Sequence, residues 1–594
     1  MSEPRRVVPP EVYDRKLEAI LAHQQEFERT KPANVPELIA RQAAARPDAP
    51  FVIFEGRQTS YGEMNGLANR YARWAANAGL KPGDCVALFM ENRPEFYSAV
   101  FGLSRAGLVV ALINNSLTGQ GLAHCARVAN ARAIVLGAEQ GALFQTARDL
   151  FDPGMPAFAT GGAVEGAETL DGHLAAESAA PIPTDRLPDR GLTDLFVYVY
   201  TSGTTGLPKA TRGPHGRFLN TSSLWSALTD ATPADRMYCC LPLYHVAGFS
   251  CASGAMIVSG GTIVLRRKFS ARAFWKDCVE HEASLFQYIG ELCRYLLNTP
   301  HDPAETQHKI RACFGNGMRP EVWGPFKERF KIPAIYEVYG ATDGNFSFLN
   351  LDQTIGPIGR ITPKMAQTTH IRFVRFDYET EQPWRGPDGF CVLAEPGEAG
   401  EAIGKVSDAH RFEGYTSKEA TEKKLLHDVF EKGDTWYRSG DLMMKDKDGY
   451  VWFVDRIGDT FRWKGENVAS GEVSGVISQE PGVSDVTVYG VAVPGHDGRA
   501  GMATITAGEA LDLDKLHARL AAELPHYARP LFLRVRGEIE ITGTFKHRKM
   551  DLVKEGFNPA AVAEPLYFND PKANAYVPID PALYEEIVSG RMKI

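Results

Sequence analysis

Two kinds of hydrophobic spacing alternate along the chain. Apolar runs with the length of a strand stand at 51–54, 85–90 and 109–113. Between these runs, apolar residues recur three and four positions apart around 68–75 and over 95–108, which is typical of helices with one buried face. This alternation of strands with helices predicts an α/β fold, in which helices cover both faces of parallel sheets.

The pattern changes in the C-terminal third of the chain. Residues 377–401 are richer in Pro, Gly and charge, so we expect an irregular antiparallel segment there. The alternation then restarts on a smaller scale, with strand, helix and strand patterns at 486–491, 513–524 and 531–535. We therefore predict a large lobe of layered sheets over residues 1–457 and a small, mobile α+β domain over 458–594, with a hinge near Gly458.

One apolar segment is long enough to cross a bilayer. Residues 237–265 contain no Asp, Glu, Lys or Arg, but Pro242, His245 and the pair Gly260-Gly261 divide them into short pieces. We predict a strand, a loop, a buried helix, a turn and a second strand rather than a membrane span. The N-terminal residues lack the apolar stretch of a signal peptide. The sequence therefore favours a cytoplasmic protein.

Composition excludes several classes of protein. The 594 residues are 44% hydrophobic and 23% charged, which fits a globular protein and neither a disordered nor a fibrous one. The net charge of −8 argues against a nucleic-acid partner, because such proteins need a basic face. Nine cysteines without a Cys-x-x-Cys pair argue against a disulfide scaffold or a zinc module. We expect buried, reduced thiols.

The most informative motif follows a β-rich run at 197–200. Its candidate anion-binding residues are Thr201, Ser202, Gly203, Thr204, Thr205, Gly206 and Lys209. Glycines let backbone N–H groups converge on an anion, hydroxyls add donors, and a lysine adds a point charge. The spacing is not that of the common P-loop, which needs Gly-x-x-x-x-Gly-Lys. A phosphate-binding loop is a better interpretation than a polar surface turn.

This loop resembles that of the adenylate-forming (AMP-binding) superfamily, which includes acyl-CoA synthetases, peptide-synthetase adenylation domains and luciferases. Five further segments resemble the later motifs of that superfamily in the same order: LPLYH at 241–245, EVYGATD at 337–343, YRSGD at 437–441, DRIGD at 455–459 and TGTFK at 542–546. Three more resemble the branch of very-long-chain acyl-CoA synthetases and fatty acid transport proteins: YIGELCRY at 288–295, GNGMRP at 315–320 and FRWKGENV at 461–468.

The resemblance implies that ATP activates a carboxylate as an acyl-adenylate, with loss of pyrophosphate. The phosphate loop would hold the β- and γ-phosphates, and Thr342 would contact the α-phosphate. Asp343 would be the ligand of a magnesium ion, because hard cations prefer carboxylate oxygens. The superfamily usually has glutamate at this position, and the shorter aspartate favours a bridging water. Further nucleotide contacts would come from Tyr339, Gly340 and Ala341.

Other nucleotide contacts are implied at a distance along the chain. The backbone of Gly315, Asn316 and Gly317 would approach the adenine edge. Asp441 would accept hydrogen bonds from the ribose hydroxyls, as carboxylates do in nucleotide sites, and Arg456 would also contact the nucleotide. Lys546 would bridge the carboxylate and the α-phosphate in the adenylation step, although His547, Arg548 and Lys549 also allow a solvated basic turn.

The second half-reaction would use coenzyme A as a co-substrate. Gly465 would line the route of its thiol after the small domain swings about Gly458, whose glycine tolerates a large change in backbone angles. His245 could gate the acyl pocket or be a core residue. We expect pocket residues within 286–295 and around Met318.

The leading hypothesis is a long- or very-long-chain fatty acid:CoA ligase. A ligase for a bile-acid-like or aromatic carboxylate uses the same chemistry, and a fatty-acid uptake protein with secondary ligase activity is a different class. An ATPase or kinase without an acyl substrate is disfavoured, because Lys546 and the hinge would then have no purpose. Because the expected substrate is apolar, peripheral contact of the protein with a membrane is a further hypothesis.

Overall fold

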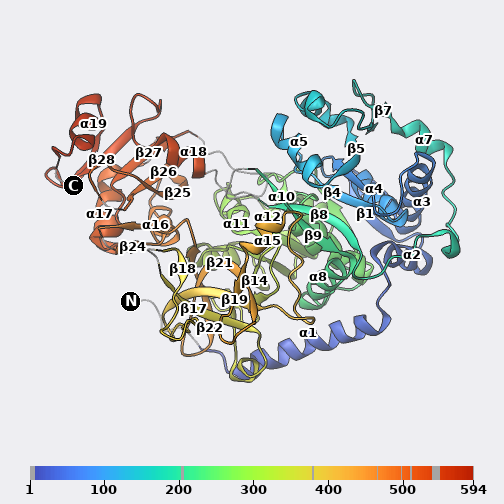
Figure 1. The fold of residues 1–594 in the computed structure, drawn as a ribbon, viewed down its shortest axis with the longest axis horizontal. Helices are drawn as coiled ribbons and strands as arrows, with labels where there is room; N and C mark the ends of the chain where they lie inside the picture. Colours follow the sequence, from blue (N-terminus) through green and yellow to red (C-terminus); the bar gives the residue numbers. More distant parts are fainter. Residues whose placement is uncertain are drawn as a thin grey trace. The chain divides into compact units, whose positions relative to one another are not determined.

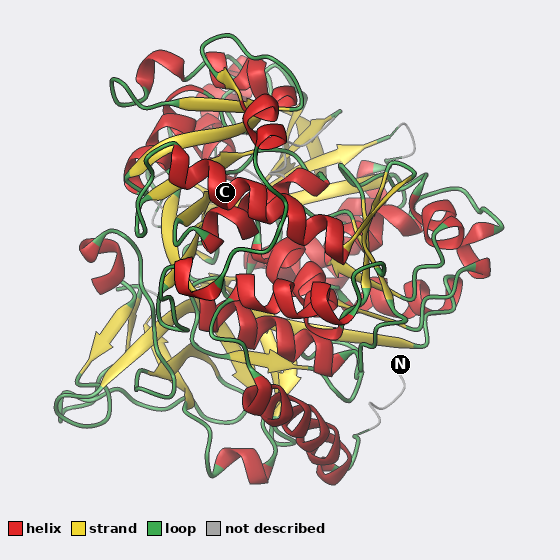
Figure 2. Cartoon of the chain, turned by 90° about the vertical axis from the view of Figure 1, so that its right-hand side faces the viewer, coloured by secondary structure: helices red, strands yellow, loops and turns green. Residues whose placement is uncertain are grey.

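The computed structural model describes residues 7–201, 207–377, 380–464, 466–496, 498–508, 511–537 and 549–592 (Figure 1). Packing divides the chain into two compact units. The first comprises residues 1–318, 324–354 and 411–423, and the second comprises residues 319–323, 355–410 and 424–594. Helices and strands are mixed throughout the chain (Figure 2), and the predicted α/β class is confirmed.

The first unit contains an eight-stranded sheet. Its order is β15 (Ser347–Leu349), β14 (Ala334–Gly340), β13 (Ala312–Asn316), β12 (Leu285–Ile289), β10 (Arg236–Cys239), β11 (Thr262–Leu265), β1 (Pro50–Phe54) and β2 (Arg57–Ser60). The strands from β14 to β1 run parallel, and only the two edge strands are antiparallel. Parallel neighbours end at the same edge of the sheet, so the residues after β12, β13 and β14 share that edge.

A seven-stranded sheet completes the strands of the first unit. Its order is β7 (Glu168–Thr169), β6 (Ala157–Thr160), β5 (Ala131–Gly137), β3 (Cys85–Phe89), β4 (Val109–Leu112), β8 (Leu195–Thr201) and β9 (Lys209–Pro214). All residues of β3 and β4 are buried, as expected for strands covered on both faces. The strands predicted at 51–54, 85–90 and 109–113 are therefore confirmed as β1, β3 and β4.

Helices connect these strands. In the first unit they are α1 (Pro10–Thr30), α2 (Val35–Ala45), α3 (Tyr61–Asn77), α4 (Pro94–Arg105), α5 (Gly119–Val128), α6 (Gly141–Gln145), α7 (Leu170–Ala176), α8 (His215–Leu228), α9 (Gly254–Ser259), α10 (Phe274–Glu280), α11 (Gly290–Leu297), α12 (Ala304–Gln307) and α15 (Lys418–Glu422). Helix α13 (Pro320–Arg329) begins in the second unit and ends in the first. The Ser60 hydroxyl accepts from the Glu63 N–H, and the Glu63 carboxylate accepts from the Ser60 N–H. This capping box fixes the start of α3.

The uncharged segment at 237–265 folds as predicted. Strand β10 leads through a loop to a π-helix (Ala247–Ser253) and α9, both largely buried. Gly260 then turns the chain with φ of +76°, a conformation that favours glycine, and β11 follows. Within the part of the chain that the structure describes, none of the helices combines the length and hydropathy needed to cross a bilayer.

The second unit contains two main sheets, of which the larger is antiparallel. The larger has the order β16 (Gly359–Arg360), β22 (Tyr450–Arg456), β21 (Thr435–Lys445), β19 (Ala399–Lys405), β17 (Ile371–Asp377) and β18 (Gln382–Pro383), with β20 (Leu425–His427) paired to β21. Strands β23 (Phe461–Trp463) and β24 (Glu466–Val468) form a separate hairpin. The antiparallel segment predicted at 377–401 is confirmed by the pairing of β17 with β18 and β19.

A five-stranded sheet forms the C-terminal part of the second unit. Its order is β25 (Val483–Val491), β26 (Ala500–Ala507), β27 (Phe532–Arg536), β28 (Leu566–Asp570) and β29 (Ala575–Pro578). The helices of this unit are α14 (Pro363–Ala366), α16 (Ser470–Ile477), α17 (Leu513–Glu523), α18 (Lys549–Glu555) and α19 (Pro581–Val588). The strand, helix and strand predicted near 486, 513 and 531 are confirmed as β25, α17 and β27.

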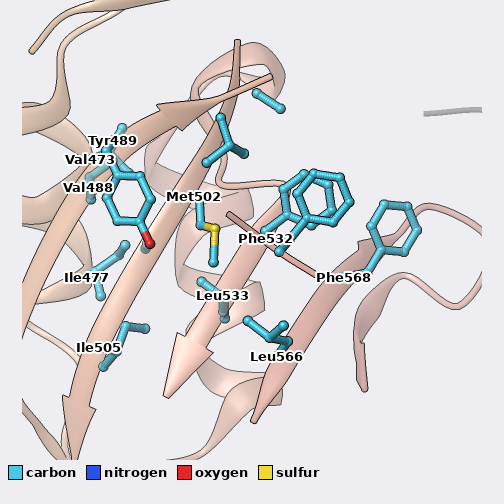
Figure 3. Close-up of a cluster of buried hydrophobic side chains, with 14 of the residues drawn as sticks. Val473, Ile477, Val488, Tyr489, Met502, Ile505, Phe532, Leu533, Leu566 and Phe568 are labelled. Carbon is cyan, nitrogen blue, oxygen red and sulfur yellow. The ribbon is translucent and has the colours of Figure 1, made fainter. Parts of the chain in front are cut away.

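This C-terminal sheet has its own hydrophobic core. Ile477 of α16, Ile505 of β26 and Phe532 of β27 lie among its buried side chains (Figure 3). Every residue of the core lies between Phe461 and Ile587, on the C-terminal side of Gly458. The compact unit that contains this core also includes residues 319–323, 355–410 and 424–457, so the expected boundary at 458 and the mobility of the small domain stay predictions.

All nine cysteines are buried and none forms a disulfide, as expected for reduced thiols. Burial raises the pKa of Cys85 and of Cys125 to about 12. A thiol with such a pKa stays protonated at neutral pH and is a poor nucleophile. These two buried thiols are therefore poor candidates for nucleophiles.

Candidate active site

The predicted phosphate loop lies between two strands of the first unit. Thr201 ends β8, Lys209 begins β9, and the two residues are direct partners in the antiparallel pairing. The predicted contacts Ser202, Gly203, Thr204, Thr205 and Gly206 lie outside the described residues. The loop therefore leaves and re-enters the sheet at one place, with the Lys209 side chain at its base.

A segment from far along the chain reaches this place. Residues 411–423 belong to the first unit, although the residues on either side of them belong to the second. The Arg212 N–H donates to the Gly414 carbonyl at 3.2 Å, and the Thr416 N–H donates to the Ala210 carbonyl at 3.1 Å. Tyr415 is thereby held against β9, and the Lys209 ammonium lies 5.9 Å from the centre of its ring. This distance suits a cation–π interaction.

Tyr415 also contacts the predicted metal ligand. Its hydroxyl donates to Oδ2 of Asp343 at 2.5 Å, and Asp343 is buried. Burial, followed by the negative charge of Asp343, raises the pKa of Tyr415 far above its usual value, so the hydroxyl keeps its proton and acts as a donor. Lys209 and Asp343, 134 positions apart in sequence, thus meet on the same tyrosine.

The turn that carries Thr342 and Asp343 is held on its other side by an arginine. Arg217 of α8 donates through Nη2 to the Thr342 carbonyl at 2.6 Å and to the Gly344 carbonyl at 2.9 Å. A guanidinium that binds two carbonyls of one turn restrains its backbone. Neither Arg217 nor Tyr415 was predicted from the sequence. Arg217 is a single charged residue on a helix, and Tyr415 lies outside the recognised motifs.

This arrangement could hold a magnesium ion. Magnesium in nucleotide sites is bound through one or two carboxylates and the phosphates, rather than by a cage of protein ligands. One buried carboxylate, on a tyrosine whose ring also faces a lysine, fits that pattern. Among the residues described, no three His, Cys, Asp or Glu side chains gather into a group that could hold a metal ion by themselves.

The predicted adenine contacts lie at the ends of neighbouring strands. Gly315 and Asn316 end β13, and Gly317 follows with φ of +82°. Tyr339 and Gly340 end the adjacent β14, with Ala341 next in the chain. The Tyr339 ring is half-buried and stacks at 6.1 Å on Phe346. The sheet therefore brings these two motifs to one edge, and the aromatic pair gives a flat apolar surface there.

The predicted ribose ligand belongs to the second unit. Asp441 of β21 faces Arg456 of β22, with Oδ1 3.7 Å from the arginine Nε. Ser439 donates to the Ala402 carbonyl at 2.7 Å, and its hydroxyl accepts from the Asp441 N–H at 3.1 Å. With Gly440 at φ of +77°, these bonds turn the strand locally and fix the Asp441 backbone. The structure thus brings Asp441 and Arg456 together.

The predicted hinge lies just after β22. Gly458 has φ of +95°, and no atom lies within 4 Å of the place where a Cβ would stand. The next residue, Asp459, forms an ion pair with Lys549, whose ammonium lies 3.0 Å from the Asp459 carboxylate. Lys546 and Gly465 lie outside the described residues, so their roles stay predictions.

His245 lies where the chain enters the π-helix. Its side chain is half-buried, and its Nδ1 accepts from the Ala247 N–H at 3.2 Å. π-Helical turns occur often at functional sites. This bond fixes the ring without showing whether it gates a pocket, and the gating role stays a prediction.

Family models place these motifs in a known group. Residues 39–399 match the model described as AMP-binding enzyme, and residues 472–546 match its C-terminal domain. The first match alone covers more than half of the chain. The chain belongs to the AMP-binding enzyme family. The adenylate-forming resemblance read from the motifs is therefore confirmed.

Curated relatives extend over most of this AMP-binding enzyme. It is 41% identical over 540 residues to long-chain fatty acid transport protein 1 of Mus musculus, which covers 89% of this chain and 83% of the relative. It is 40% identical over 561 residues to long-chain fatty acid transport protein 2 of Rattus norvegicus, covering 93% and 90% respectively. The branch predicted from the sequence is therefore confirmed.

Solved structures share the fold of this AMP-binding enzyme. An anthranilate CoA ligase bound to anthranoyl-AMP superposes with a TM-score of 0.76 at 19% identity, covering 90% of this chain and 98% of that one. A Mycobacterium tuberculosis fatty acyl CoA synthetase gives 0.61 at 24% identity, covering 88% and 98%. These similarities establish the adenylate-forming fold.

Proposed function

We propose that this AMP-binding enzyme activates a long- or very-long-chain fatty acid with ATP and transfers the acyl group to coenzyme A. The products are acyl-CoA, AMP and pyrophosphate. The observation that carries the proposal is the meeting of Lys209 and Asp343 on Tyr415, at the base of the phosphate loop. A cation and a buried carboxylate at one place suit a polyphosphate with its magnesium ion.

The chemistry explains why both groups are needed. A carboxylate that attacks the α-phosphate brings two anions together, so the site must offset negative charge as it accumulates. Lys209 supplies a fixed positive charge beside the loop. Thr342, on the turn restrained by Arg217, is poised to contact the α-phosphate. Asp343 would hold a magnesium ion, which would supply further positive charge to the phosphates.

The predicted ribose ligand, Asp441, lies in the second unit. The Asp441 carboxylate is largely buried, and the Ser439 hydroxyl fixes its backbone. Such a carboxylate accepts hydrogen bonds from both ribose hydroxyls without a change in its own structure. Arg456, half-exposed beside it, is available to the nucleotide.

The identity of the acyl substrate is inferred from the relatives. Both transport proteins are named for long-chain fatty acids, and this chain covers more than four-fifths of each of them. The two solved ligases that act on small aromatic and fatty acids share only the fold at these identities, so they do not discriminate between acids. A fatty acid is therefore the preferred carboxylate.

The test is a measurement of pyrophosphate release with a panel of carboxylates. We expect release with palmitate and longer fatty acids, and acyl-CoA formation only when CoA is added. Benzoate, anthranilate and a bile acid serve as competing substrates in the same assay. Faster turnover of an aromatic or bile acid would contradict the fatty-acid assignment. Phosphate release that is independent of any carboxylate would contradict ligase chemistry altogether.

A further inference from the structure

A row of three residues crosses three neighbouring strands of the eight-stranded sheet. Tyr288 of β12 pairs in register with Gly315 of β13, and Gly315 pairs with Glu337 of β14. Since Gly315 has no side chain, the Tyr288 ring can pass over it. A Cβ on Gly315 would lie 2.5 Å from Cδ2 of this ring, which real Cβ atoms do not tolerate. The Tyr288 hydroxyl then reaches Oε2 of Glu337 at 2.7 Å.

The Glu337 carboxylate also binds the turn that follows β13. The Gly317 N–H donates to Oε1 at 2.5 Å, and the Met318 N–H donates to Oε2 at 3.3 Å. The carboxyl group is almost completely buried. A buried carboxylate is costly unless donors surround it, and here a hydroxyl and two backbone N–H groups do so. None of the roles assigned above uses this group.

The same turn is confined from the opposite side. A Cβ on Gly290, the first residue of α11, would lie 1.7 Å from the Gly317 carbonyl oxygen. The backbones of α11 and of the turn therefore approach as closely as only a glycine permits. Held by Glu337 on one side and by Gly290 on the other, the turn has little freedom to move.

We propose that Glu337 and Tyr288 are positioning residues that fix the backbone of residues 316–318 and thereby set the affinity for the adenine ring of ATP. The inference rests on the proposed nucleotide site at this edge of the sheet. It assigns to Gly315 a second reason for being glycine, because a side chain there would displace Tyr288 from Glu337.

The charge state of Glu337 makes the proposal testable, because the effect of this residue on ATP affinity should depend on pH. Burial raises the pKa of the Glu337 carboxyl to about 8, although the Tyr288 hydroxyl and the two N–H groups oppose the rise. Titratable groups near it include Tyr288 itself, Cys293 of α11 and Cys313 of β13, and burial raises the pKa of each of them well above normal. The phenol and both thiols stay neutral, so among these groups Glu337 is the one that changes charge near pH 8.

The sign of the effect follows from this pKa. Above about pH 8 the carboxylate is ionised and accepts from all three donors. As the pH falls through that value it takes up a proton, and its contribution to holding the turn weakens. The raised pKa also means that Glu337 favours the folded state most at low pH and loses this contribution as the pH rises from 4.5 to about 8.

The test is direct binding of ATP to Glu337→Gln, measured by calorimetry without any carboxylate substrate. An amide has one acceptor oxygen, so it leaves at least one donor without its partner. We expect Kd for ATP to rise about fivefold at about pH 9, and the gap from the unaltered enzyme to close at about pH 6.5. Tyr288→Phe should raise Kd less, and the double variant should be no worse than Glu337→Gln alone.

Asp434→Asn is the matched control. Asp434 also accepts from two successive backbone N–H groups, those of Val429 and Phe430, and from the Trp436 ring N–H. Its turn carries none of the predicted site residues, so Kd for ATP should stay unchanged. Equal loss of ATP affinity in both variants, or a pH-independent gap for Glu337→Gln, would overturn the proposal. An unaltered enzyme that does not bind ATP would instead contradict the proposed function, and the inference with it.

Discussion

Replacing Lys546 with alanine is expected to slow acyl-adenylate formation about 10²–10³-fold, the typical loss when one preorganised charge-stabilising group is removed. The ammonium is expected to bridge the attacking carboxylate and the α-phosphate, where negative charge accumulates. Fatty acid-dependent pyrophosphate release, measured without CoA, reports this step alone.

The Lys546→Ala variant is expected to lose the first half-reaction and to keep the second. Transfer of the acyl group from supplied acyl-adenylate to CoA involves no new bond to phosphorus, so Lys546→Ala should retain it. Lys554→Ala is the matched control, because it removes one exposed positive charge from nearby α18. Unchanged pyrophosphate release in Lys546→Ala, or an equal loss in Lys554→Ala, would contradict the assignment of Lys546.

Replacing Tyr415 with phenylalanine is expected to raise the magnesium concentration needed for half-maximal ATP binding about 10–100-fold. The hydroxyl donates to Oδ2 of Asp343 at 2.5 Å and so orients the carboxylate. Loss of a hydrogen bond that orients a metal ligand costs metal affinity in this range. Calorimetric titrations of ATP at several magnesium concentrations give the value without a turnover assay.

Tyr576→Phe controls for the loss of a buried hydroxyl. The Tyr576 hydroxyl donates to the Pro530 carbonyl at 2.7 Å within the C-terminal sheet. We expect this variant to bind ATP with the magnesium dependence of the unaltered enzyme. If Tyr415→Phe also keeps that dependence, Tyr415 does not orient the metal ligand, and the contact with Asp343 is only structural.

Hydrophobic periodicity predicted best those elements whose side chains have one pattern of burial along the whole element. Strands β3 and β4 read as continuous apolar runs because helices cover both of their faces. Helix α1 was missed, because only Tyr13 and Ile20 are buried along its 21 residues. A helix that buries so few positions leaves a weak apolar stripe in the sequence.

The residues of the candidate site also fall into those that the sequence predicted and those that it did not. Lys209, Asp343 and Asp441 were predicted from the sequence, because each of them lies in a motif, which is a short run of characteristic residues. Tyr415 could not be predicted in this way. Its contact with Asp343 joins residues 72 positions apart, and Tyr415 lies in the segment 411–423, whose neighbours along the chain belong to the other unit. Glu337 lies inside a recognised motif, but its proposed role depends on the register of three strands. Sequence spacing does not specify that register.

Oxygen transfer from fatty acid to AMP tests the central claim most directly. When palmitate labelled with oxygen-18 in its carboxylate reacts with ATP through an acyl-adenylate, one carboxylate oxygen becomes bonded to the α-phosphorus. Attack of CoA at the carbonyl carbon then leaves that oxygen on AMP. We predict that mass spectrometry finds AMP with one heavy oxygen and acyl-CoA with the other. Unlabelled AMP, or label in inorganic phosphate beside ADP, would contradict adenylate formation by this enzyme.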